Sequence, residues 1–305
     1  MSAAADVERV YAAMEEAAGL LDVACARDKI YPLLTAFQDT LAESVIVFSM
    51  ANGRRSTDLD FSIAVPPGEK DPFTTVVEKG IFPATGHPVD DLLADTRKHL
   101  QTGLFAIDGE VTSGFKKTYV SFPTDDMPGV AQLSVIPSMP PSVAENADLF
   151  ARYGLDKVQM ISMDYKKRQV NLYFNDLKRQ YLEPASVVAM ATELGLHVPS
   201  ELGLEFCKGA FAVYPTLSWD TGKIERLCFA VISTDPNLVP STDERDVELF
   251  RNYATKAPYS YVGEQRTLVY GITLSPHEEY YKLGAYYHIT DVQRQLVKAF
   301  EALKD

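Results

Sequence analysis

The stretch DYKKRQVNLYF, residues 164–174, alternates like a strand but has no simple apolar face. Read with a period of two, one face mixes charged and apolar side chains. The other face carries tyrosines and amides around a single cation: Tyr165, Lys167, Gln169, Asn171 and Tyr173. A half-buried strand ordinarily has one apolar and one solvated face. We therefore expect this second face to line an enclosed polar space.

The same order of elements, helix followed by two strands, returns five times along the chain. Helical periodicity changes to strand alternation in each round, and DTG at residues 220–222 is typical of a hairpin turn. The pattern predicts helices in 5–22, 29–43, 72–80, 87–100, 142–152, 183–195, 243–255 and 290–303. It predicts strands in 44–50, 59–65, 103–108, 115–122, 157–163, 168–174, 209–219, 224–233, 266–274 and 278–289.

Five hairpins separated by helices give about ten antiparallel strands. Closing such a sheet into a barrel removes its exposed edges, and the helices can then cover the outside. The 305 residues would allow two domains, but barrels of this length often form one. We therefore predict an α/β (α+β) fold, in which residues 1–305 form a single ten-stranded antiparallel barrel of five repeated units around a solvent-filled lumen.

The second strand of each hairpin carries a charged residue on its more polar face. Any one of these could be a solvated strand position, but the recurrence in all five units favours a shared site inside the barrel. The five residues are Asp60, Lys117, Lys167, Arg226 and Lys282.

Four cations and one carboxylate in one lumen leave a surplus of three positive charges, which suits an organic diphosphate. A carboxylate beside a diphosphate needs a divalent cation between them, so we predict that Asp60 is the single protein ligand of Mg²⁺. Tyrosine faces can hold a carbocation by cation–π attraction, and four are expected nearby: Tyr119, Tyr173, Tyr214 and Tyr286. This set predicts ionisation of an allylic diphosphate by electrostatic catalysis.

Composition restricts the classes of function. The formal net charge of −13 is unlike the basic footprint of a nucleic-acid-binding protein. The three cysteines, Cys25, Cys207 and Cys228, give neither a disulfide framework nor a paired metal motif. The N-terminal residues lack a signal-peptide pattern, and no apolar run approaches the length of a membrane span. We expect a cytoplasmic monomer with neither a nucleic-acid nor a membrane partner.

The run DDLLAD at residues 90–95 resembles the aspartate-rich DDxxD metal motif of isoprenyl diphosphate synthases, but its third aspartate lies one residue too far. Acidic residues that follow Pro88 suit the first turn of a helix, where they complement the helix dipole. We therefore predict a helix start here and not a metal site.

Longer stretches of the chain resemble the ABBA aromatic prenyltransferases, and the resemblance covers the whole sequence. The stretches are GLFAIDGEVTSGFKKTYVSFPTD (103–125), YGLDKVQMISMDYKKRQVNLYF (153–174), YATKAPYSYVGEQRTLVYG (253–271) and EEYYKLGAYYHITDVQRQ (278–295). The resemblance implies a ten-stranded barrel ringed by helices. It also implies transfer of a geranyl group from geranyl diphosphate to a carbon or phenolic oxygen of a dihydroxylated acceptor, of dihydroxynaphthalene, resorcinol or flavonoid type, with farnesyl as the alternative group.

The resemblance also implies roles for individual residues. Asp60 matches the magnesium-associated carboxylate, and the diphosphate-binding residues match Lys117, Lys167, Asn171, Tyr214, Arg226 and Lys282. Prenyl-chain contacts match Val47, Met160 and Tyr214, and the lumen faces add Tyr119 and Ser121. Acceptor contacts match Gln159, Tyr173, Phe211, Leu217, Tyr286, Val292 and Gln293, the resemblance also puts Ala212 near the acceptor, and the lumen face adds Gly284.

The chain departs from the family pattern at two of these positions. Ala212 stands where a member of the family has serine near the acceptor, and Ser121 stands where that member has phenylalanine near the prenyl chain. These differences bear on the acceptor and on the chain length of the donor.

A different class of protein would share many of these features. A non-catalytic barrel that carries an anionic hydrophobic small molecule would also have a lined lumen. Such a carrier has no need of a carboxylate facing its cations, so Asp60 favours the enzyme.

Overall fold

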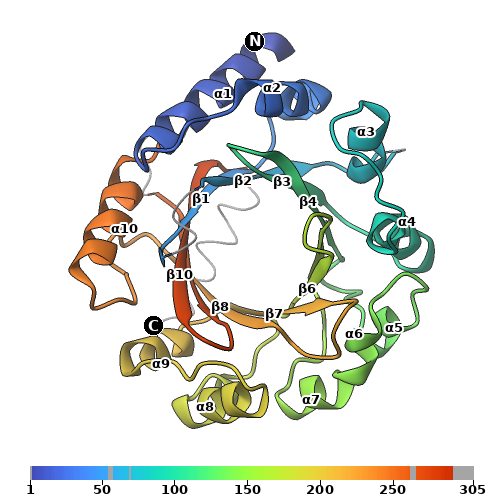
Figure 1. The fold of residues 1–305 in the computed structure, drawn as a ribbon, viewed down its shortest axis with the longest axis vertical. Coiled ribbons are helices and arrows are strands. Elements are labelled where there is room, and N and C mark those ends of the chain that lie inside the picture. The colour runs from blue at the N-terminus through green and yellow to red at the C-terminus, as the bar shows by residue number, and fades with distance from the viewer. Residues whose placement is uncertain (1, 54–57, 69, 262–265, 291–305) are drawn as a thin grey trace.

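Ten antiparallel strands close into one barrel, in which β1 pairs with both β2 and β10 (Figure 1). The computed structural model describes residues 2–53, 58–68, 70–261 and 266–290. All ten predicted strands are confirmed, with ends shifted by a few residues. They are β1 (Ile46–Ala51), β2 (Asp60–Val65), β3 (Phe105–Glu110), β4 (Gly114–Ser121), β5 (Met160–Asp164), β6 (Gln169–Tyr173), β7 (Ala212–Ser218), β8 (Arg226–Ser233), β9 (Leu268–Leu274) and β10 (Glu279–His288).

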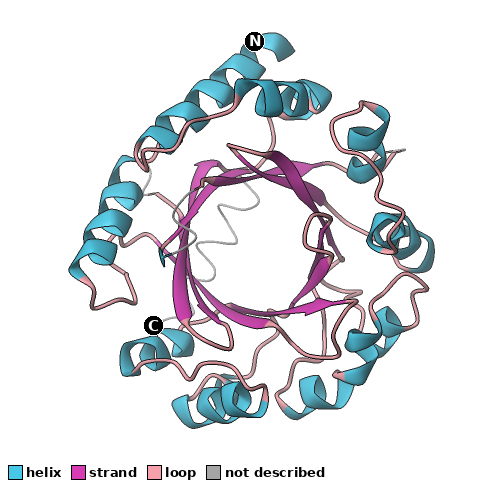
Figure 2. Ribbon diagram, viewed as in Figure 1, coloured by secondary structure: helices cyan, strands magenta, loops and turns pink. Residues whose placement is uncertain are grey.

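The helices form an outer ring around the strands (Figure 2). They are α1 (Ala3–Gly19), α2 (Arg27–Ala36), α3 (Pro72–Glu78), α4 (Val89–His99), α5 (Val130–Ser134), α6 (Pro141–Glu145), α7 (Ala147–Arg152), α8 (Pro184–Glu193), α9 (Glu201–Lys208) and α10 (Glu244–Lys256). Short 3₁₀ turns, η1 (Gln38–Thr40) and η3 (Arg179–Tyr181), follow α2 and precede α8. The predicted helix at 290–303 lies almost entirely outside the described residues.

Two helices, α5 and α9, were not predicted. Helix α5 is only five residues long. Helix α9 contains Gly203, which has a low helix propensity. A Cβ at Gly203 would lie 2.6 Å from Ile272 Cδ1, so glycine allows α9 to approach β9 closely. The DDLLAD run behaves as predicted, because Asp90 and Asp91 lie in the first turn of α4.

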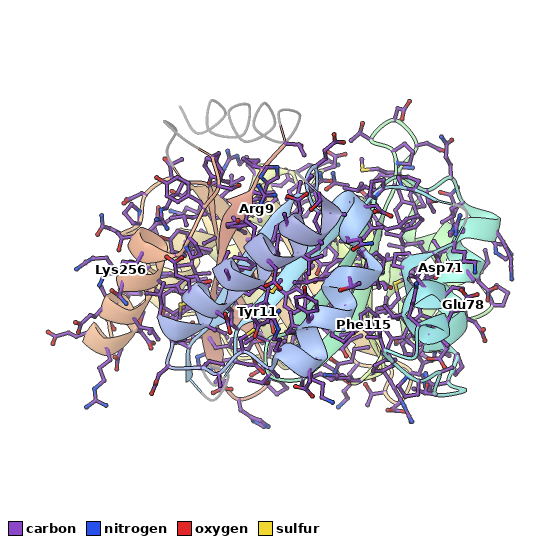
Figure 3. The ribbon with its side chains drawn as sticks, turned by 90° about the horizontal axis from the view of Figure 1, so that it is seen from above. Arg9, Tyr11, Asp71, Glu78, Phe115 and Lys256 are labelled. Carbon is purple, nitrogen blue, oxygen red and sulfur yellow. The ribbon has the colours of Figure 1, made fainter. Side chains whose placement is uncertain are left out.

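The main hydrophobic core lies between the barrel and the helices. Alternate strand residues such as Phe61 and Ile63 are fully buried there, as the period-two pattern requires. Figure 3 views the side where α1 and α2 cross the strands, with Tyr11 of α1 labelled and with Asp71 and Glu78 at the two ends of α3. The opposite, more polar side of each strand faces the lumen.

The expectation that Tyr165 lines the lumen on the same face as Lys167 and Asn171 was wrong. Residues 165–168 form the turn between β5 and β6, and Arg168 has a φ of 53°. Asp164 Oδ1 accepts a hydrogen bond from the Lys167 backbone N–H at 2.9 Å, as an aspartate commonly does at the start of a turn. Tyr165 therefore does not line the lumen: its ring stacks on Phe73 of α3, with centroids 4.0 Å apart.

A β-bulge interrupts the pairing of β3 with β4. Asp108 pairs with Lys117 but Gly109 pairs with Phe115, so Lys116 is the extra residue on β4. The backbone is tightly packed here, because a Cβ at Gly109 would lie 2.5 Å from Phe61 Cζ. Simple alternation places Lys116 under the helices, but the bulge turns its ammonium toward carboxylates of β2 and β3.

Candidate active site

One end of the lumen holds a cavity of about 350 Å³, which is within the range of small-molecule sites. Strands from both halves of the chain contribute to it, because the barrel closes between β1 and β10. All of the residues predicted for the diphosphate and its metal line this one cavity: Asp60, Lys117, Lys167, Asn171, Tyr214, Arg226 and Lys282.

Neighbouring side chains orient two of the cations. Arg226 Nη2 donates to Gln169 Oε1 at 2.7 Å, and Gln169 Nε2 in turn donates to the Glu225 carboxylate. Lys117 Nζ lies 3.8 Å from Asp164 Oδ2 on the adjacent strand β5. These contacts pre-organise the guanidinium and the ammonium before an anion arrives, which lowers the cost of binding.

Lys167 reaches the cavity from the turn after β5. Burial lowers the pKa of its ammonium, and the neighbouring cations Arg226 and Lys117 act in the same direction against Asp164. The positive charges of Lys167, Arg226 and Lys117 therefore repel one another in the cavity. A polyanion between them would relieve this repulsion.

The prediction of four cations and a single carboxylate was wrong. Five cationic and four acidic side chains line the cavity, so the formal surplus is one positive charge and not three. The bulge adds a cation, and strands β3 and β5, whose inward faces were not followed in the sequence, add two of the carboxylates. The residues beyond the predicted set are Lys116, Asp58, Glu110 and Asp164.

Asp60 faces the cavity with 36% of its side chain exposed. Its Oδ1 accepts a hydrogen bond from Lys116 Nζ at 2.7 Å. Burial favours the protonated carboxyl, but Lys116 outweighs it with help from Lys282 and Lys117. The pKa of Asp60 is therefore held below its usual value, and the group is a carboxylate in neutral solution.

The donor atoms around Asp60 suit a hard cation such as Mg²⁺, which prefers oxygen ligands. Glu110 and Asp108 lie on the adjoining strand β3, and the buried Asp108 Oδ1 makes no hydrogen bond, although Lys116 Nζ lies 3.3 Å away. Within the described ranges, however, no group of three or more acidic, histidine or cysteine side chains is arranged to hold a metal ion. The residues fit an ion that takes most of its ligands from elsewhere.

Three of the predicted tyrosines lie in a row beside the cations. The rings of Tyr173 and Tyr214 stack with centroids 4.5 Å apart, and Tyr119 follows at 6.1 Å from Tyr173. Tyr119 OH donates to Asp108 Oδ2 at 3.1 Å, which fixes its orientation. The fourth, Tyr286, lies farther along the lumen, where it pairs with Val47.

An apolar cluster lies at the opposite end of the described strands. Ile232, Tyr261 and Ile289 form a cluster of buried side chains, against which Phe211 and Tyr286 pack. Strand register places the remaining prenyl-chain and acceptor residues on the inward face between this cluster and the cavity: Val47, Ser121, Met160, Tyr173, Ala212 and Gly284.

Leu217 is separated from the predicted acceptor set. It pairs with Val170 on the outward face of β7, and its fully buried side chain belongs to the core under the helices. Gln159 precedes β5 and bonds through its backbone to Tyr173. Val292 and Gln293 lie outside the described residues.

Comparison with known proteins identifies this arrangement. The family model described as aromatic prenyltransferase Orf2 matches residues 5–300. The chain belongs to this aromatic prenyltransferase family.

Several relatives of this prenyltransferase match it over nearly their full lengths. A flaviolin linalyltransferase from Streptomyces virginiae is 42% identical over 289 residues, which is 94% of each chain. A furaquinocin biosynthesis prenyltransferase from Streptomyces sp. (strain KO-3988) is 40% identical over 99% of this chain and 96% of its own. A 5,10-dihydrophenazine-1-carboxylate 9-dimethylallyltransferase from Streptomyces anulatus is 38% identical over 94% of this chain and 95% of its own. This protein is thus an enzyme that transfers a prenyl group from a prenyl diphosphate to an aromatic acceptor.

Several residues of the prenyltransferase site were missed in the sequence. Lys116 was missed because a bulge cannot be seen in an alternating pattern, although Gly109 and Gly114 flank the hairpin. Asp108 and Asp164 could have been found by following the inward face of the first strand of each hairpin.

The described helices of the enzyme include none with the length and apolar character of a membrane span.

Proposed function

We propose that this aromatic prenyltransferase uses geranyl diphosphate, with farnesyl diphosphate as a second donor, and a dihydroxylated aromatic acceptor. The acceptor would be of dihydroxynaphthalene, resorcinol or flavonoid type. One observation carries the proposal: a lumen with cations at one end, tyrosine rings beside them and apolar side chains beyond. This order follows the parts of an allylic diphosphate placed lengthwise in the barrel.

The cations act on the leaving group. When the bond between C1 of the prenyl chain and the diphosphate oxygen breaks, its electron pair stays with the diphosphate. Lys117, Arg226 and Lys282 line the cavity, and they would lie around the position where this negative charge increases. Fixed charges in an enclosed site stabilise such a transition state without reorganising. No covalent bond to the protein is needed.

The carboxylate and the tyrosines complete the chemistry. Asp60 would hold Mg²⁺, with diphosphate oxygens and water as its other ligands, and the ion would neutralise charge on the leaving group. The faces of Tyr119, Tyr173 and Tyr214 stabilise the allylic cation. A ring carbon or phenolic oxygen of the acceptor then bonds to C1, and water or a hydroxyl group takes the proton that the acceptor loses.

A direct assay tests the proposal. The protein is incubated with geranyl diphosphate and magnesium chloride, and with a panel of dihydroxynaphthalenes, resorcinols and flavonoids, and products are read by mass spectrometry. A product heavier than its acceptor by one geranyl group, formed only with magnesium, is the expected result. Reactions with dimethylallyl and farnesyl diphosphates show whether the donor is assigned correctly. A protein that is stabilised against heat by geranyl diphosphate but makes no product with any donor would be a carrier.

Ser121 is expected to influence the preferred length of the prenyl chain. It lies four residues beyond Lys117 on the inward face of β4, or about 13 Å by strand rise, where the tail of an extended geranyl group would run. The side chain is small, and its hydroxyl donates to Leu104 O at 2.9 Å, which holds it against the barrel wall. We expect Ser121→Phe to lower kcat/KM for farnesyl diphosphate relative to geranyl diphosphate, because a ring there occupies the volume of the longer tail.

Ser121→Thr is the matched control, since it keeps the hydroxyl and adds one methyl group. The measurement is the ratio of kcat/KM for the two donors in each variant. An unchanged ratio in Ser121→Phe would show that residue 121 does not contact the tail. The flexible Met160, which pairs with Ser121, would then fill the space between residue 121 and the tail.

A further inference from the structure

The bulge in β4 sends two successive lysines into the barrel, and the structure gives them different surroundings. Lys117 lies in the cavity wall with 17% of its side chain exposed. Lys116 has only 5% of its side chain exposed and lies among three carboxylates. Its Nζ is 2.7 Å from Asp60 Oδ1, 3.3 Å from Asp108 Oδ1 and 3.4 Å from Glu110 Oε1.

Without an ammonium among them, these three carboxylates would place three negative charges close together and attract a free divalent cation, although they are not arranged as a metal site made by the protein alone. They lie on the neighbouring strands β2 and β3, and oxygen is the donor that such cations prefer. With the ammonium among them, a metal ion that reaches Asp60 meets a fixed positive charge in direct contact with one of its ligands. Lys117 and Lys282 also act on Asp60, so the repulsion is not limited to one residue.

An organic diphosphate changes this balance. Its negative oxygens would lie against Lys117, Arg226 and Lys282, which line the cavity with Asp60. The same oxygens would provide the ligands that a metal ion lacks in the protein alone. The diphosphate would then offset the cations that repel the metal ion, and the metal ion would offset the carboxylates that repel the diphosphate. Either one alone would meet charges of its own sign.

We propose that Lys116 is an internal counter-cation that keeps the carboxylates around Asp60 from binding free divalent metal, so that the metal enters only together with the diphosphate. This inference rests on the proposed metal and diphosphate site. Lys116 is a positioning residue in this scheme, because it acts on Asp60 and not on the substrate. Met is close to Lys in length and lacks the charge, so Lys116→Met removes the cation with little change in packing.

The test uses Mn²⁺ as the probe, because the sharp electron paramagnetic resonance spectrum of the free ion is lost on binding. Wild-type protein is expected to take up Mn²⁺ at Asp60 only when inorganic pyrophosphate is present, measured as the loss of signal beyond that of Mn²⁺ and pyrophosphate with the Asp60→Asn variant. We expect Lys116→Met to bind Mn²⁺ without pyrophosphate at least about 100-fold more tightly than wild type, because it lacks the repulsion of a charge a few ångströms away. The double variant Lys116→Met/Asp60→Asn should lose this gain, and any uptake that it retains belongs to the acidic surface.

Two results would overturn the proposal. One is wild-type protein that binds Mn²⁺ alone as tightly as with pyrophosphate, through a site that Asp60→Asn removes. The other is a folded Lys116→Met variant with unchanged affinity for Mn²⁺ alone. The wild-type measurement decides the matter if Lys116→Met does not fold. Failure of pyrophosphate to bind wild-type protein with or without Mn²⁺ is a separate result, which would overturn the diphosphate site itself.

Discussion

Replacing Asp60 with asparagine is expected to abolish magnesium-dependent prenyl transfer. The substitution keeps the size of the side chain and removes the charge that is proposed to hold a metal ion beside the diphosphate. Stabilisation of a leaving group by a bound metal contributes several kcal/mol, so a loss of at least about a hundredfold in kcat/KM is the expected magnitude. The measurement is the initial rate of product formation across a range of magnesium concentrations.

The fold should survive this change, because Lys116 keeps two other partners, Asp108 and Glu110. Asp91→Asn is the matched control, since Asp91 is exposed in the first turn of α4 and is expected to leave the rate unchanged. Melting curves with and without pyrophosphate and magnesium separate the two roles of Asp60. A loss of stability in the empty barrel reports its pairing with Lys116, and a loss of stabilisation by the ligands reports metal binding. Full activity in Asp60→Asn would refute the metal role.

Neutralising the cations of the cavity is expected to weaken donor binding and slow ionisation. Each of Lys117→Met, Arg226→Met and Lys282→Met removes charge-assisted hydrogen bonds to phosphate oxygens. Such a bond contributes about 1.5–3 kcal/mol, or roughly ten- to a hundredfold in kcat/KM. The effect should appear in kcat as well as in KM, because the charge on the diphosphate increases as the bond breaks.

Steady-state kinetics with geranyl diphosphate measure this effect, and inorganic pyrophosphate is expected to inhibit wild-type enzyme competitively. Lys79→Met serves as the control for loss of a positive charge, because Lys79 is exposed at the end of α3 and is not among the residues that line the cavity. Kinetics that stay the same in all three cavity variants would rule out the diphosphate site. Arg226→Met should also release Gln169, so its effect includes the loss of an oriented neighbour.

The fold could be predicted because the same local signals repeat. Strand alternation such as Phe61 and Ile63 against Asp60 and Ser62 appears in every hairpin, and closure follows from the need to cover strand edges. Prediction of side-chain direction failed where a local backbone irregularity interrupts a strand. The turn at 165–168 and the bulge at Lys116 each change the direction of one side chain, and neither alters the hydrophobic pattern of the strand around it.

The candidate site was predictable to the same degree. Lys117, Arg226 and Lys282 were found because each is a cation on the strand face that was predicted to point inward. The structure brings all three into one cavity. Leu217 was misplaced because its assignment came from resemblance and not from its own strand, where it alternates outward from Thr216. The excess of carboxylates depends on which strands are neighbours, a tertiary property that no single segment contains.

Closure of the barrel between β1 and β10 also has a consequence for biosynthesis. Ala51 lies opposite Lys282, so this seam joins the first strand to be made to one made after the other eight strands. Contacts of such large sequence separation form late, and domains begin to fold from the N-terminus while the chain is still being made. Until β10 emerges from the ribosome, β1 presents a free edge that can pair with other chains. The cavity spans the same seam, with Asp60 on β2 and Lys282 on β10, so a nascent chain with four finished hairpins has its strands but not yet an active site.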